Sequence, residues 1–191
     1  MAEKKISEQS WFKKIIRGLA LPPTKSEKGC WPLRIAILGV GNELNGDDAA
    51  GVLAARQLSD RLSGYTNLLI LEGGSAPENV SGPIRRFQPD WLILLDIAQM
   101  DAEPGVIGWF EMGEIDGVSA ATHGLPVTML ARYLREETGC QVGAVFIQPA
   151  SLEFGAPLSL PVKSAVKELV DGLVGYFGSL KGTGQLIDKR H

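Results

Sequence analysis

Apolar and polar residues alternate in two different patterns along the chain, and together these patterns predict an α/β fold. Short apolar runs typical of buried strands lie at residues 34–39, 67–71, 90–96, 105–111 and 141–147. Apolar residues at helical spacing predict helices at residues 11–20, 47–62, 125–137 and 161–180. Strands that alternate with helices form a mainly parallel sheet, and functional sites gather where the strands of such a sheet end.

The first 30 residues differ in charge from the rest of the chain. They hold seven Lys/Arg and three Glu, a local charge of +4, which leaves −7 for the remainder of a chain whose net charge is −3. This contrast predicts an N-terminal extension with a short basic helix and a linker (1–30). One domain (31–180) and a polar tail (181–191) follow.

The helix predicted at residues 11–20 has one apolar face and one basic side. The apolar face consists of Trp11, Phe12, Ile15, Ile16 and Leu19. Such a helix either docks on a partner or a membrane surface, or it is an appendage that packs on the body or stays mobile, which is the interpretation we favour. The sequence indicates no burial site for this face. We expect the extension to be dispensable for activity, with at most a weak contact to a partner or an anionic membrane surface.

Composition narrows the class of protein. A chain of 191 residues with 45% apolar and 21% charged residues is ordinary for one soluble globular domain. Its longest apolar runs, 35–40 and 91–95, are far shorter than the about 20 residues that a membrane-spanning helix needs. The acidic body argues against a nucleic-acid partner. Cys30 and Cys140 have no metal-type spacing and no signal peptide is evident, so we expect a cytoplasmic protein.

The glycine-rich turn after the first predicted strand excludes two nucleotide-binding motifs. Leu44 stands where the dinucleotide fingerprint needs a third small residue, and Asp47-Asp48 replace the Lys and Ser/Thr of a phosphate loop. Two carboxylates at a helix start would also repel a phosphate. What remains is a pair of carboxylates, for which the simplest interpretation is that Asp47 caps the helix and Asp48 favours its first turn.

Two further polar residues are expected at the same edge of the sheet. Asp96 ends an apolar strand, and His123 precedes a predicted helix. Each has an ordinary structural explanation, as a turn residue or a hydrogen-bonded histidine. Together with the carboxylate pair they form a candidate N/O metal site, with the remaining coordination left to water or substrate. No serine nucleophile motif and no zinc-protease helix motif is present. The residues alone predict an α/β protein with a metal-recognising site.

Five blocks in one order resemble the maturation endopeptidases of nickel-iron hydrogenases. The blocks are ILGVGN (37–42) with GDD (46–48), EGGSAPEN (72–79), LLD (94–96), THGLP (122–126) and IQP (147–149). The resemblance covers about residues 34–180, and GSAPEN is similar to the branch that serves hydrogenase 3 of formate hydrogenlyase. The first 30 residues have no counterpart in the family.

The resemblance implies a fold, an activity and a set of site residues. The fold would be a three-layer α/β/α sandwich with a mainly parallel, five-stranded mixed sheet. The activity would be that of an aspartyl-type endopeptidase that removes the C-terminal extension of a hydrogenase large-subunit precursor after nickel insertion. Asp48, Asp96 and His123 would be both the metal-contacting and the catalytic residues, with Asp47 as the helix cap behind them. The nickel would be supplied by the substrate rather than permanently bound.

Several alternatives stay open from the sequence. Nickel could position the scissile bond and polarise a water or carbonyl, or it could only dock the substrate while Asp96 or Asp48 acts as general base. The chain could also be a non-catalytic metal-sensing scaffold that binds the precursor, or a peptidase or amidase with other substrates. For the turn itself, we predict a positive φ for at least one of Gly39, Gly41 and Gly46.

Overall fold

A mixed, mainly parallel sheet of five strands forms the centre of the molecule in the computed structural model, which describes residues 10–20, 33–115, 119–120 and 127–180. The order is β2-β1-β3-β6-β4, in which only β4 runs antiparallel to its neighbour. A two-residue strand, β5, pairs antiparallel with the end of β3. The strands are β1 (Ile35–Val40), β2 (Leu68–Gly74), β3 (Trp91–Gln99), β4 (Ile107–Glu111), β5 (Ser119–Ala120) and β6 (Gln141–Ile147).

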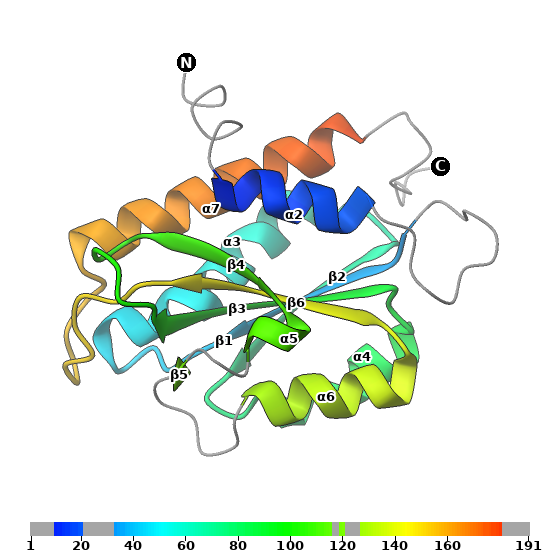
Figure 1. The fold of residues 1–191 in the computed structure, drawn as a ribbon, viewed down its shortest axis with the longest axis horizontal. Coiled ribbons are helices and arrows are strands. Elements are labelled where there is room, and N and C mark those ends of the chain that lie inside the picture. The colour runs from blue at the N-terminus through cyan, green and yellow to red at the C-terminus, as the bar shows by residue number, and fades with distance from the viewer. Residues whose placement is uncertain (1–9, 21–32, 116–118, 121–126, 181–191) are drawn as a thin grey trace.

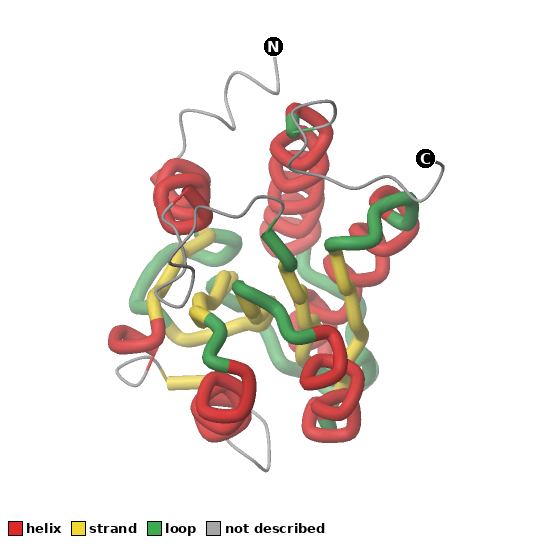
Figure 2. The backbone as a smooth tube through the Cα atoms, turned by 90° about the vertical axis from the view of Figure 1, so that its right-hand side faces the viewer, coloured by secondary structure: helices red, strands yellow, loops and turns green. Residues whose placement is uncertain are grey.

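Helices cover both faces of this sheet, which gives the three layers expected from the sequence (Figures 1 and 2). Side chains of α2, α3 and α7 share one apolar core with the sheet, and those of α4 and α6 share the other. The α-helices are α2 (Ser10–Ala20), α3 (Ala50–Leu62), α4 (Ser81–Phe87), α5 (Met112–Ile115), α6 (Val127–Thr138) and α7 (Leu160–Ser179). Two short 3-10 helices, η1 (Gly46–Ala49) and η2 (Pro77–Val80), precede α3 and α4. No helix in the described ranges is long and apolar enough to cross a membrane.

Burial on both faces explains why the sequences of the central strands are apolar almost without interruption. Every residue of β1 is buried, and so is every residue of β3 except Gln99, because helices lie on both faces. The predicted helix at 47–62 is divided into η1 and α3, and the strand predicted at 90–96 continues to Gln99.

The apolar face of α2 is buried in the body of the protein. Trp11, Phe12, Ile15 and Leu19 belong to the core shared with α3 and α7, and Figure 1 shows α2 lying alongside α7. The Trp11 indole N–H donates to the Glu168 carboxylate of α7. The expectation that this face has no burial site is therefore wrong. Of the two forms of the favoured interpretation, the appendage that packs on the body is confirmed.

The basic side of α2 remains in solvent, where Lys13, Lys14 and Arg17 are exposed. Gly18 of this helix lies against Trp109 of β4. A Cβ built on Gly18 would be 3.5 Å from the Trp109 indole ring. Trp109 in turn lies against Trp91, with ring centroids 6.1 Å apart. Removing α2 would uncover both tryptophans, so we expect the extension to contribute to stability, which its charge pattern did not indicate.

Truncating one fully buried side chain of α2 tests this packing. We expect Ile15→Ala to lower the free energy of unfolding by about 2–5 kcal/mol, the range for a large-to-small change in a well-packed core. The matched control is the exposed Lys14→Ala, which should stay within about 0.5 kcal/mol of the parent. Chemical denaturation measures both. Equal stabilities of the two variants would show that α2 is not part of the core.

Candidate functional site

The carboxyl ends of the parallel strands carry the candidate site, and its position depends on how closely α3 approaches the sheet. A Cβ built on Gly51, in the first turn of α3, would overlap the carbonyl oxygens of Leu95 on β3 and Val40 on β1. A Cβ on Gly39 would likewise overlap the Gly51 carbonyl. Only glycine at these two positions allows the helix to rest directly on the strand backbones. The residues just before α3 are therefore brought to the edge between β1 and β3.

The turn between β1 and η1 has the positive φ angles expected of its glycines. Gly41 has φ 138° and Gly46 has φ 54°, which confirms the prediction, whereas Gly39 serves the close approach instead. At Gly41 a Cβ would overlap the carbonyl oxygen of Asp48. The turn thus folds back over the residue that it leads to.

Asp47 holds the loop between β6 and α7 and does not cap a helix. Its carboxylate accepts hydrogen bonds from the N–H groups of Ala150 (2.8 Å), Ser151 (2.9 Å) and Ser159 (2.7 Å), and from the Ser159 hydroxyl (3.0 Å). No side-chain cap is formed at the start of η1, where Asn45 is the N-cap residue. The interpretation of Asp47 as a cap is therefore wrong. Because four donors saturate this buried carboxylate, it is a structural group.

Asp48 is buried beneath the glycine-rich turn. The Asn42 N–H donates to its Oδ2 at 3.1 Å, and its own N–H donates to the Asn45 carbonyl. These two bonds fix the carboxylate relative to the end of β1. Asp47 and Asp48 therefore differ in direction: Asp47 binds the β6–α7 loop, and Asp48 binds the loop that leaves β1.

Asp96 lies in β3, next to the point where β1 ends. The register pairs Gly39 with Leu95, so Asp96 is one residue beyond that pair. Its side chain is buried, and its Oδ1 accepts the N–H of Ile97 at 2.8 Å. Leu94 and Ala98, two residues to either side of Asp96, belong to the core on the α4 and α6 face. Since side chains alternate along a strand, Asp96 projects to that same face.

His123 lies outside the described residues, but the chain is anchored on both sides of it. Ala120 pairs with Ala98 at the end of β3, and Val127 is buried in the core that also contains Ala98. His123 is three residues further along the chain than Ala120, so their Cα atoms are at most about 11 Å apart. Within the described part of the chain, no three His, Cys, Asp or Glu side chains are arranged to hold a metal ion. Convergence of Asp48, Asp96 and His123 therefore stays a prediction.

Gln148 is a supporting residue that sequence reasoning did not assign. Its buried side chain accepts the Met100 N–H (2.7 Å) and donates to the Gln99 side chain (2.8 Å). These bonds hold the end of β3, the stretch with which β5 pairs. The only sequence signal was its place in the IQP block, which gave no role.

An ionic network on the surface joins the glycine-rich turn to β2. Two guanidinium nitrogens of Arg56, in α3, donate to the carboxylate of Glu43 in the glycine-rich turn, and the shorter N···O distance is 2.7 Å. The same guanidinium also pairs with the carboxylate of Glu72 in β2, at 2.6 Å. The Arg56 guanidinium lowers the pKa of Glu43. The three side chains are between 40% and 47% exposed, so solvent screens these pairs and they contribute little to the stability of the fold.

Cys140 is not a candidate nucleophile. It is buried at the start of β6, at the end of the sheet opposite to the carboxylates, and burial raises the pKa of its thiol. A protonated, enclosed thiol is unreactive near neutral pH. Cys30 lies outside the described residues.

The fold and these buried carboxylates define a three-layer α/β protein with an acidic site at the carboxyl edge of its sheet. Comparison with known proteins narrows the class. Residues 52–175 match the hydrogenase maturation protease family, a range that contains Asp96 and His123 and begins four residues after Asp48. The hydrogenase 3 maturation protease of Escherichia coli K12 is 35% identical over 144 residues, which are 75% of this chain and 90% of that relative.

Solved structures agree with the sequence relatives. A NiFe hydrogenase maturation protease from Thermococcus kodakarensis KOD1 superposes with a TM-score of 0.70 at 32% identity, covering 76% of this chain and 93% of that one. The solution structure of an Escherichia coli endopeptidase superposes with a TM-score of 0.64 at 30% identity. The match covers 82% of this chain and 96% of that one. The chain belongs to the hydrogenase maturation protease family. It is therefore an endopeptidase, and the alternative of a non-catalytic scaffold is not supported.

The close approach of α3 to the sheet is directly testable. We expect Gly51→Ala to destabilise the fold by about 3 kcal/mol or more, because the added methyl group must displace the backbone of two strands. Gly175→Ala, in the C-terminal part of α7 with nothing within 4 Å of its Cβ position, is the control and should be neutral or stabilising by up to about 1 kcal/mol. Thermal and chemical unfolding compare the two. Equal stability would mean that the close contact does not position the site.

Proposed function

We propose that this endopeptidase removes the C-terminal extension of a nickel-iron hydrogenase large-subunit precursor, and that it uses the nickel already inserted in the precursor as its recognition element. The observation that supports the proposal is that Asp48 and Asp96 are buried where the neighbouring strands β1 and β3 end, with Asp96 two residues from Ala98, the residue that pairs with Ala120. The solved relatives include a protein described as a NiFe hydrogenase maturation protease.

The proposed ligands suit a metal ion that a substrate still holds. Two carboxylates and a neutral imidazole are ligands that nickel accepts. Three ligands leave positions for groups of the precursor, so the enzyme would hold free nickel only weakly and would bind it firmly only when the precursor supplies the remaining ligands. An empty precursor would offer the three side chains nothing to bind, and it would not be cut.

Two routes for the hydrolysis are compatible with these roles. In the first, the nickel polarises the attacked carbonyl or a water molecule. In the second, the nickel only positions the precursor, and Asp48 or Asp96 takes the proton of the attacking water and later gives one to the leaving amine. Both routes consume one water and release the C-terminal extension, and the second makes the enzyme an aspartyl-type protease.

We place the reaction in the cytoplasm, where Cys30 and Cys140 would remain reduced. With the apolar face of α2 buried, any contact of the extension with an anionic membrane surface would be limited to exposed basic residues. The exposed basic residues of α2 are Lys13, Lys14 and Arg17. At about 1 kcal/mol for each residue, such a contact would be weak and sensitive to salt.

Incubation with nickel-loaded and nickel-free precursor tests the proposal. We expect only the nickel-loaded precursor to be shortened, as measured by intact-protein mass. His123→Ala, Asp48→Asn and Asp96→Asn should each slow the cleavage by about 10²-fold or more, because the scissile bond is no longer positioned.

Two substitutions serve as controls for these variants. Asp60→Asn changes an exposed carboxylate of α3, and His191→Ala removes the second histidine of the chain; both should cleave at the parent rate. Equal cleavage of nickel-free precursor would contradict nickel recognition. Normal cleavage by His123→Ala would remove His123 from the site.

A further inference from the structure

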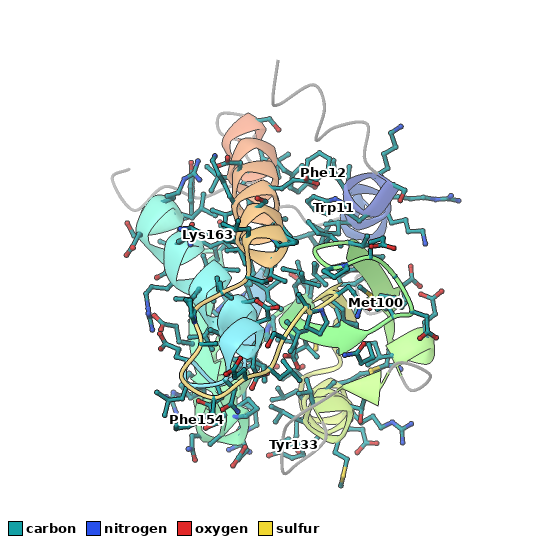
Figure 3. All side chains as sticks on the ribbon, turned by 90° about the vertical axis from the view of Figure 1, so that its left-hand side faces the viewer. Trp11, Phe12, Met100, Tyr133, Phe154 and Lys163 are labelled. Carbon is teal, nitrogen blue, oxygen red and sulfur yellow. The ribbon has the colours of Figure 1, made fainter. Side chains whose placement is uncertain are left out.

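Two exposed apolar side chains stand on neighbouring loops at the edge that bears the carboxylates. Leu44, in the turn between β1 and η1, is 58% exposed, and Phe154, in the loop between β6 and α7, is 75% exposed. Figure 3 looks onto this edge and shows Phe154 on the loop that leads into α7. A single exposed apolar residue needs no explanation, but two on adjoining loops beside a catalytic site indicate a binding surface.

Backbone contacts hold these two loops together. The Gly155 N–H donates to the Leu44 carbonyl at 2.7 Å, which places the residue after Phe154 directly against Leu44. The Asp47 N–H donates to the Ser151 carbonyl, and the Asp47 carboxylate binds the N–H groups of Ala150 and Ser151. The residue next to Asp48 thus fixes the loop that carries Phe154. Hydrogen bonds thus connect the two loops that carry the apolar pair to the segment that contains Asp48.

Each apolar residue is presented by its own hydrogen-bonded turn. Phe154 is the second residue of a turn closed by the Ala156 N–H and the Glu153 carbonyl, with Gly155 at φ 77° as in a type II turn. Leu44 donates its N–H to the Asn42 side chain at 3.0 Å. Because both backbones are held before a partner arrives, little conformational entropy is lost when the side chains become buried.

We infer that Leu44 and Phe154 form a docking surface for an apolar segment of the hydrogenase large-subunit precursor, outside the group of residues that contacts its nickel. This inference rests on the proposed function, since the occupant is the protein whose chain must reach Asp48. The surface is continuous with the catalytic edge through Asp47, so a precursor that reaches Asp48 also meets Leu44 and Phe154. It acts on substrate affinity and leaves the chemical step unchanged.

The kinetics of Leu44→Ser and Phe154→Ser with nickel-loaded precursor test the docking surface. Burying a Leu or Phe side chain fully corresponds to about 10- to 100-fold in affinity. We expect each substitution to raise KM by about tenfold with kcat unchanged, and Phe154→Leu to restore most of the loss. Both side chains are exposed, so circular dichroism and the melting temperature should match those of the parent.

The matched control is Tyr133→Ser. Tyr133 is 41% exposed on the outer surface of α6, and Figure 3 shows it on that helix and not on the β6–α7 loop. Its substitution should leave KM and kcat unchanged. If the parent and the Leu44→Ser, Phe154→Ser double variant cleave the precursor with the same KM, the docking surface is overturned. A fall in kcat with unchanged KM would also overturn it. Failure of the parent itself to shorten the precursor would instead contradict the proposed function.

Discussion

The contact of α3 with the backbones of β1 and β3 is the constraint on which the site depends. Gly39 and Gly51 remove the side chains that would otherwise separate the helix from the strands. The helix therefore starts at the sheet edge, and the residues before it fill the space where β1 ends and β3 continues. A helix held at the usual distance by side chains would move the Asp47–Asp48 segment away from Asp96.

Two neighbouring carboxylates have different structural roles as a result. Asp47 is saturated by four donors from the β6–α7 loop, whereas Asp48 is held by the turn that leaves β1. The first orders a loop far away in sequence, and the second is the carboxylate that we propose for catalysis. The β6–α7 loop also carries Phe154, so one aspartate links the ordering of the catalytic edge to the surface that we propose for substrate binding.

The sequence predicted the parts of the fold that follow from local patterns. Continuous apolar runs located five strands, and the glycine-rich turn was correctly expected to need positive φ. The seven-residue α4 was missed because a helix of two turns, with Gly82 and Pro83 near its start, has too little periodicity to recognise. The role of Asp47 could not be found locally, because its partners lie more than 100 residues further along the chain.

The burial of α2 depends on a surface of the folded body that the sequence does not locate. The apolar face of the helix was visible in the sequence, but Trp91, Trp109 and Glu168 come from three separate elements that only the folded sheet brings together.

The resemblance to a protease family named Asp48, Asp96 and His123, and the structure brings Asp48 and Asp96 to one edge of the sheet. The central claim is that all three bind one ion and that Asp47 does not. A crystal structure of the chain soaked with Ni²⁺ or Cd²⁺, with the ion located by anomalous scattering, tests it most directly. The account predicts one ion about 2 Å from oxygens of Asp48 and Asp96 and a nitrogen of His123, with Asp47 still bound to the β6–α7 loop. An ion bound by Asp47, or one that contacts only one of the three residues, would contradict it.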